Sequence, residues 1–214
     1  MPVSPRTIGR LSLYRRLVTL LQAQGMKNVY SHQLASMAGS TAAQVRRDLM
    51  SVGYSGNPAK GYDIAELIGA IGRILDAPDG QKVALVGVGH LGRALLNYFS
   101  ARRPKATIEA AFDKDPHKVN RMILGYRALP ATQMQEVVRQ EGISVAILCV
   151  PADEAQRVAD DLVDAGIRSI VNFAPVPLKV PSNIYVESMD ITMSLEKAAY
   201  FARQSDFEKE SMEP

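Results

Sequence analysis

A short glycine-rich segment, GVGHLG, is the part of the sequence best suited to chemistry. It holds Gly87, Gly89 and Gly92 in the pattern G-x-G-x-x-G, directly after the apolar run KVALV. Between a strand and a helix, such a loop binds a pyrophosphate at the helix N-terminus, where free N–H groups and the helix dipole favour anions. We therefore predict a dinucleotide-binding loop. Gly87 allows the turn, Gly89 allows close approach of the ligand, and Gly92 lets the helix pack closely on the strand.

An acidic residue stands at a suitable distance from this loop. Asp113 follows the apolar run TIEAAF, 24 residues after Gly89. A carboxylate at this place accepts hydrogen bonds from the adenosine ribose and repels a 2′-phosphate, so it favours NAD(H) over NADP(H). Lys114 and Lys118 lie close to it in the sequence.

The sequence contains few residues that could use a bound dinucleotide in catalysis. The three histidines, His32, His90 and His117, all precede the later part of the chain, where a dehydrogenase usually keeps its acid/base. The sequence contains no metal-ligand cluster and no Ser/His/Asp grouping, so we expect neither a catalytic residue nor a metal site. The segment CVPADEAQ, at the end of the expected strand VAILCV, places Val150 and Pro151 over the expected cofactor.

The elements around the loop predict a parallel sheet. The apolar runs KVALVGV, TIEAAF, VAILCV, SIVNF and the weaker NIYVES alternate with helical stretches. Strands that alternate with helices form a doubly wound, Rossmann-like α/β sheet with helices on both faces. We expect this dinucleotide-binding domain over residues 81–188.

The first 80 residues predict a separate domain. A helix, a short helix, a tight turn at Gly39 and a third helix, TAAQVRRDLM, follow one another in helix-turn-helix order. The segment GYSGNPAKGYDI, with Lys60 near its tip, predicts a wing directly after the third helix. The fold class that we expect is therefore a winged helix-turn-helix domain followed by a Rossmann-like domain.

Charge favours DNA as the partner of the first domain. Residues 1–60 hold eight Lys and Arg but one acid, Asp48, whereas residues 61–214 hold 17 Lys and Arg against 21 acids. Such an asymmetry indicates a polyanion partner for the basic part alone. In the predicted recognition helix, Gln44 suits adenine, and Arg46 and Arg47 suit guanine or phosphate.

The remaining composition favours a cytoplasmic protein with no membrane partner. No apolar run approaches the roughly 20 residues that a membrane-spanning helix needs. The first residues, MPVSPRTIGR, are not followed by the apolar stretch of a secretory signal. The one cysteine, Cys149, cannot form an internal disulfide.

Together these segments resemble the Rex family of bacterial redox-sensing transcriptional repressors. The resemblance is carried by RLSLYRRL, SHQLA with TAAQVRRDL, VGVGHLGRALLNY, AFDKDPHKV, VPADEAQRVADDLVDAGIRSIVNFAPVPLKVP and VESMDITMSLE. It implies a homodimer in which a C-terminal helix, here within residues 189–214, is swapped between subunits. It also implies binding to palindromic, double-stranded operator DNA. In that family NADH releases the DNA, and NAD+ competes for the site and favours the DNA-bound form.

The motifs above, and for the other residues the resemblance carried over by position, imply three sets of functional residues in this chain. The DNA-contacting set is Ser31, Gln44, Arg46, Arg47 and Lys60. The cofactor-binding set is Gly87, Gly89, His90, Leu91, Gly92, Asp113, Lys118, Val150, Pro151, Asn172, Phe173, Ala174 and Pro175. The third set would switch the protein between its DNA-bound form and its NADH-bound form, and consists of Arg16, Tyr98 and Asp190.

Two other functions compete with this interpretation. The chain could be a small NAD-dependent oxidoreductase whose N-terminal part only holds subunits together. It could also be a regulator that binds another nucleotide or CoA on the same sheet, because a fold does not determine its ligand.

Overall fold

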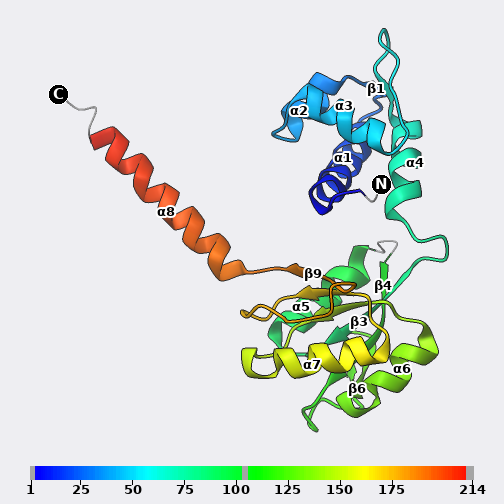
Figure 1. The fold of residues 1–214 in the computed structure, drawn as a ribbon, viewed down its shortest axis with the longest axis vertical. Helices are drawn as coiled ribbons and strands as arrows, with labels where there is room; N and C mark the ends of the chain where they lie inside the picture. The colour runs from blue at the N-terminus through cyan, green and yellow to red at the C-terminus, as the bar shows by residue number, and fades with distance from the viewer. Residues whose placement is uncertain (1–2, 103–105, 211–214) are drawn as a thin grey trace. The chain divides into compact units, whose positions relative to one another are not determined.

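A computed structural model describes residues 3–102 and 106–210 of the chain. The chain divides into two compact units, Met1–Pro78 and Asp79–Pro214. Figure 1 shows the helical first unit in blue to cyan and the sheet of the second unit mainly in green to orange.

Four helices and two short strands make up the first unit. They are α1 (Pro5–Ala23), β1 (Asn28–Val29), α2 (Ser31–Met37), α3 (Ala42–Ser51), β2 (Tyr62–Asp63) and α4 (Ile64–Leu75). The Thr41 hydroxyl caps α3 by accepting a hydrogen bond from the Gln44 backbone N–H. One apolar core, including Leu11, Leu34 and Leu67, joins the helices. The predicted helix-turn-helix order is therefore present in α2 and α3.

The predicted wing is a short turn above a two-stranded sheet. Strands β1 and β2 pair antiparallel, with Val29 opposite Tyr62. Ahead of β2, Asn57 and Gly61 exchange two backbone hydrogen bonds of 2.7 Å each. The Asn57 side chain also accepts hydrogen bonds from the backbone N–H groups of Ala59 and Lys60. This turn leaves the Lys60 side chain exposed at the tip.

A seven-stranded sheet forms the centre of the second unit. Its strands are β3 (Gln81–Val86), β4 (Ala106–Asp113), β5 (Met122–Ile123), β6 (Tyr126–Pro130), β7 (Val145–Leu148), β8 (Ser169–Asn172) and β9 (Tyr185–Ser188). Their order is β5-β6-β4-β3-β7-β8-β9, and every neighbouring pair is parallel except β5 with β6. The predicted mostly parallel sheet is confirmed, and the β5–β6 hairpin is an addition that we did not predict.

Helices cover both faces of this sheet (Figure 1). They are α5 (His90–Arg102), a 3-10 turn η1 (Ala131–Gln133), α6 (Met134–Glu141) and α7 (Ala152–Ala165). Ala84 and Val86 of β3 belong to the core that includes α6 and α7, whereas Val83 and Leu85 belong to the core that includes α5. This alternation along one strand gives the sheet two buried faces.

The last described helix, α8 (Ile191–Glu210), keeps its large apolar side chains up to Phe201 exposed in the single chain. They include Ile191 at 64%, Leu195 at 69% and Phe201 at 64% exposure. No helix in the described part of the chain combines the length and the apolar character that crossing a membrane requires.

Candidate functional site

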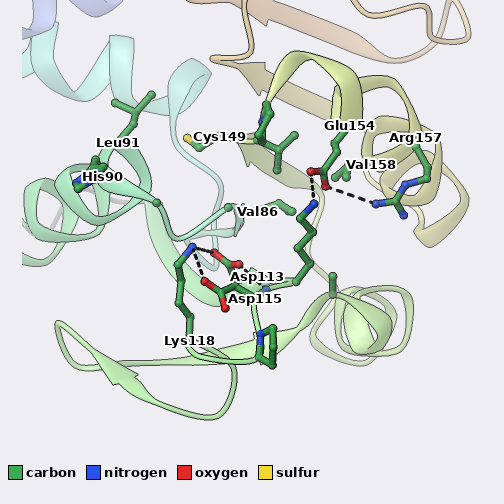
Figure 2. Close-up of a pocket in the computed structure, with 17 residues that line it drawn as sticks. Val86, His90, Leu91, Asp113, Asp115, Lys118, Cys149, Glu154, Arg157 and Val158 are labelled. Carbon is green, nitrogen blue, oxygen red and sulfur yellow. Dashed lines mark hydrogen bonds and ion pairs between the residues drawn. The ribbon is translucent and has the colours of Figure 1, made fainter.

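A cavity of about 710 Å³ opens at the carboxyl ends of β3, β4 and β7 (Figure 2). This edge of an open α/β sheet is where such folds bind ligands. Eight of the predicted cofactor residues line it: Gly87, Gly89, His90, Leu91, Asp113, Lys118, Val150 and Pro151. The elements that position them are the β3–α5 loop, the end of β4 and the start of α7.

The three glycines of the loop have different surroundings. A Cβ at Gly92 would lie 2.0 Å from the carbonyl oxygen of Gly87. Gly87 has a φ of 97°, and a Cβ there would lie 2.3 Å from the carbonyl oxygen of Cys149. Among the described residues other than its two chain neighbours, a Cβ at Gly89 would have no atom within 4 Å, although this residue lines the cavity. Packing within the chain therefore requires glycine at positions 87 and 92 but not at 89.

Asp113 is held firmly at the end of β4. Its carboxylate accepts hydrogen bonds from the Val88 and Asp115 backbone N–H groups, at 2.8 and 2.9 Å. The Lys118 ammonium lies 3.1 Å from the same carboxylate, and only 7% of the Asp113 side chain is exposed. A carboxylate has about four lone-pair positions, so Asp113 keeps acceptor capacity for a hydroxyl group of a ligand.

An ion-pair cluster crosses the cavity opposite the glycine loop, and we did not predict it. Lys114, after β4, pairs with Glu154 of α7, and Arg157 lies 3.8 Å from the same carboxylate (Figure 2). Glu154 is 16% exposed. The signal was present in the segment ADEAQR, because a helix that starts at this sheet edge has its first turns beside the ligand site.

Of the other predicted cofactor residues, Gly92 lies on α5, Asn172 ends β8, and Phe173, Ala174 and Pro175 lie in the loop after it. The buried Asn172 side chain donates to the carbonyl oxygen of Val176 and accepts from the Ala174 backbone N–H, which fixes this loop. Ala174 and Pro175 line a separate hollow of about 200 Å³ together with Asp190. Phe173 is half-buried in the core on the α5 face.

The three predicted switch residues are distributed over both units. Arg16 is exposed on α1 of the first unit. Tyr98 lies on α5 of the second unit, 47% exposed, with its ring edge-on to that of Phe99. Asp190 caps α8, because its carboxylate accepts a hydrogen bond of 2.8 Å from the Met193 backbone N–H.

Cys149 borders the cavity as a protonated thiol. Burial raises the pKa of this thiol to about 12, because an apolar environment disfavours the thiolate. The described residues contain no group of three or more His, Cys, Asp or Glu side chains that could hold a metal ion.

The predicted DNA-contacting residues lie on α2, α3 and the wing. Arg46 donates a hydrogen bond of 3.0 Å to the Ser31 hydroxyl, and both residues line a hollow of about 420 Å³ that extends to the wing residues Asn57 and Pro58. Arg47, one residue further along α3, is also exposed. These guanidinium groups are suited to phosphate or base contacts.

Asp48 is a buried carboxylate on the inner face of α3, at 3% exposure. Arg10 donates two hydrogen bonds to it, of 2.6 and 2.7 Å, and the Tyr14 hydroxyl donates a third of 3.0 Å. Burial alone would raise the pKa of Asp48, but hydrogen bonds from Arg10, Gln44 and Tyr14 outweigh it and leave this pKa below its usual value.

This carboxylate makes the first unit sensitive to acid. A group whose pKa is lower in the folded state stabilises that state above its unfolded pKa, and the contribution is lost as the pH falls through the folded pKa. We expect Asp48→Asn to lose about 2 kcal/mol at pH 7, because hydrogen bonds to a charged group are replaced by neutral ones. The difference from wild type should shrink below about pH 4.

Hydrogen exchange of the α1 and α3 amides, corrected for the intrinsic rate at each pH, measures this stability. Asp63→Asn is a suitable control, because Asp63 caps the neighbouring helix α4. A difference for Asp48→Asn that stays constant down to pH 3 would contradict the proposed electrostatic origin.

Two family models match the chain. The model described as a CoA binding domain matches residues 79–176, and the model described as a putative DNA-binding protein N-terminus matches residues 2–49. Among curated proteins, the redox-sensing transcriptional repressor Rex of Lactobacillus gasseri is 37% identical over 195 residues, which is 91% of each chain. Rex of Carboxydothermus hydrogenoformans is 39% identical over 92% of this chain and 95% of its own.

Solved structures give the same relationship. RSP, a Rex-family repressor, superposes with a TM-score of 0.87 at 30% identity, with complete coverage of both chains. RSP in complex with β-NAD+ and operator DNA gives a TM-score of 0.89 at 31% identity, covering 98% of this chain and 97% of the other. RSP in complex with β-NADH gives a TM-score of 0.86 at 31% identity, covering 98% and 99%.

Proposed function

This chain belongs to the Rex family of redox-sensing transcriptional repressors, and we propose that it binds operator DNA in a manner controlled by NADH and NAD+ in its second unit. Membership of a repressor family favours the regulator over an oxidoreductase. Relatives of known structure have been solved with β-NADH, and with β-NAD+ and operator DNA. We place the same ligands in the cavity of the second unit and on the α3 surface of the first.

The observation that carries the proposal is the open space over Gly89. Apart from the two adjoining residues, no atom of the described chain lies within 4 Å of a Cβ built there, yet the position borders the cavity at the start of α5. A pyrophosphate at a helix N-terminus needs this close approach to the backbone. Asp113 and Lys118 would hold the adenosine ribose, and the loop from Asn172 to Pro175 would lie toward the nicotinamide.

We propose that the protein acts as a homodimer in the cytoplasm. The exposed apolar surface of α8 suits a second copy of the chain, in agreement with the expected helix exchange. Two copies present two α3 helices to the two halves of a palindromic operator. Lys60 at the wing tip would contact the DNA backbone.

The reduced and oxidised cofactors differ by a hydride and a positive charge on the nicotinamide ring. A ligand shifts an equilibrium only through different affinities for the two states, so the discriminating residues must lie near that ring or transmit its state. We assign this role to Phe173 with Arg16, Tyr98 and Asp190. A change from 1:99 to 99:1 in the two states needs about 10⁴-fold different affinity, or about 5.5 kcal/mol.

A titration at constant salt tests this function. The wild-type chain first selects an operator from a random duplex library, and its affinity for this operator is then measured with NADH, NAD+ or CoA. We expect saturating NADH to weaken operator binding about 100-fold, within the usual range of allosteric coupling. NAD+ at the same concentration should compete with NADH and restore binding.

Each alternative gives a different result in this titration. Operator binding that responds to CoA but not to NADH would assign the cavity to CoA. The absence of a selected operator, together with turnover of NADH, would support the oxidoreductase.

A further inference from the structure

The side chain of Gln44 is engaged on both of its polar ends. Its amide nitrogen donates a hydrogen bond of 2.8 Å to Asp48, one turn further along α3. Its amide oxygen accepts a hydrogen bond of 3.0 Å from the Arg47 guanidinium. A glutamine that recognises adenine must offer its amide nitrogen and its amide oxygen to the base together. In this chain one N–H of that amide and one lone pair of its oxygen already make contacts within the protein, and these two contacts set the direction of the amide.

Arg47, Gln44 and Asp48 thus form a series of hydrogen bonds, and its inner end, at Asp48, is rigid. Asp48 receives the two hydrogen bonds from Arg10 and one from the fully buried Tyr14 hydroxyl, in addition to the one from Gln44. Arg10 and Tyr14 both belong to α1 and precede Asp48 by 38 and 34 residues, respectively. Residues of α1 hold this carboxylate in place. Because it accepts a hydrogen bond from the Gln44 amide nitrogen, it determines the orientation of that amide.

The outer end of the chain of contacts is Arg47. Its side chain is exposed, and a guanidinium group has five N–H donors, so the contact with Gln44 leaves others available. Paired N–H donors in one plane match O6 and N7 of guanine. Arg46 is held differently, by Ser31 beside the wing, and therefore lies in a separate contact network.

We propose that Gln44 is a positioning residue that contacts no base, and that Asp48 and Gln44 together orient Arg47 to recognise a guanine in each operator half-site. This inference rests on the proposed DNA binding. It replaces the adenine contact that the sequence suggested for Gln44, and it assigns a specificity role to Asp48, which faces inward.

Operators selected from a random duplex library by four proteins test this assignment. The proteins are the wild type, Gln44→Met, Arg47→Lys and, as a matched control, Gln22→Met on the exposed face of α1. The wild-type site should contain a guanine whose replacement by 7-deazaguanine weakens binding about tenfold, within the range for one bidentate contact. Gln44→Met and Arg47→Lys should each reduce this preference about fivefold or more, and Gln22→Met should keep it.

The double variant gives a second readout that a general loss of stability would not produce. If Gln44 acts through Arg47, then Gln44→Met should cost little further discrimination once Arg47 is lysine, so the two effects are strongly non-additive. Additive effects would overturn the inference. So would a Gln44→Met protein that loses preference for an adenine while it retains the guanine. A wild-type chain that enriches no sequence would instead overturn DNA binding itself, and the inference with it.

Discussion

We expect Gly89→Ala to lower the affinity of the chain for NADH by about 100-fold, or about 2.7 kcal/mol, and to shift its unfolding temperature by no more than about 2 °C. The added methyl group meets no atom of the protein, so the fold tolerates it. It occupies the space through which a pyrophosphate reaches the backbone of the loop. Binding followed by NADH fluorescence, together with a thermal melt of the same sample, measures both effects.

Gly92→Ala is the matched comparison, because the same methyl group is added three residues away. Its Cβ would lie 2.0 Å from the carbonyl oxygen of Gly87, so the loop or α5 must move. We expect a loss of about 3 kcal/mol of stability from this overpacking. For a unit of this size that corresponds to about 10 °C in unfolding temperature. Normal NADH binding by Gly89→Ala would show that this face of the loop does not approach the dinucleotide.

The glycine loop illustrates what local sequence can predict. A strand, three glycines at fixed spacing and a helix are all specified within about a dozen neighbouring residues, so the turn at Gly87 and the close packing at Gly92 follow from the local pattern. Asp113 lies further away, but its distance from the loop is set by one helix and one strand. The structure accordingly places Asp113 against the Val88 N–H.

The β5–β6 hairpin shows why other elements were missed. Strand β5 has only two residues, too few for any alternation of apolar and polar side chains. Its turn consists of Leu124, at a φ of 51°, and Gly125. Short hairpin turns are usually recognised in a sequence by Asn-Gly or Asp-Gly. The hairpin therefore depends on β6 pairing with β4 at the sheet edge, which is a tertiary contact.

The contacts of Asp48 could be predicted from the sequence only in part, less well than the glycine loop but better than the β5–β6 hairpin. Its partner Arg10 is 38 residues away, so no local pattern gives the pairing. The helical spacing did hold a signal, however, because Asp48 is three residues after Val45 and next to Leu49, on the face of α3 that is buried. An acid on an apolar helix face requires a cation or hydrogen-bond donors. The basic first quarter of the chain could supply them.

The exposed apolar side chains of α8 lead to the second prediction with a large effect, which concerns the proposed dimer. At about 100° per residue, Ile191 and Leu195 lie on one face, whereas Met193 and Tyr200 lie on the opposite one. A helix that is apolar on several sides is normally enclosed rather than packed on one side. A second copy of the chain that receives this helix would enclose it.

Leu195→Asp should therefore convert the proposed dimer into monomers. A buried, unpaired carboxylate costs about 3 kcal/mol or more at each of the two symmetry-related contacts. The dimer dissociation constant should then rise about 10⁴-fold. Sedimentation velocity measures the change of mass, and Glu196→Lys, at the adjacent exposed position, is the control for altered charge on the same helix.

Loss of the dimer should weaken operator binding by about 100-fold or more, because the second half-site no longer benefits from the high effective concentration of a linked subunit. The glycine loop, Asp113 and Lys118 all belong to one chain, so a Leu195→Asp monomer should still bind NADH measurably. A Leu195→Asp protein that remains dimeric would exclude α8 as the main interface. A monomer that still binds a full palindrome with wild-type affinity would show that one recognition helix is sufficient for operator binding.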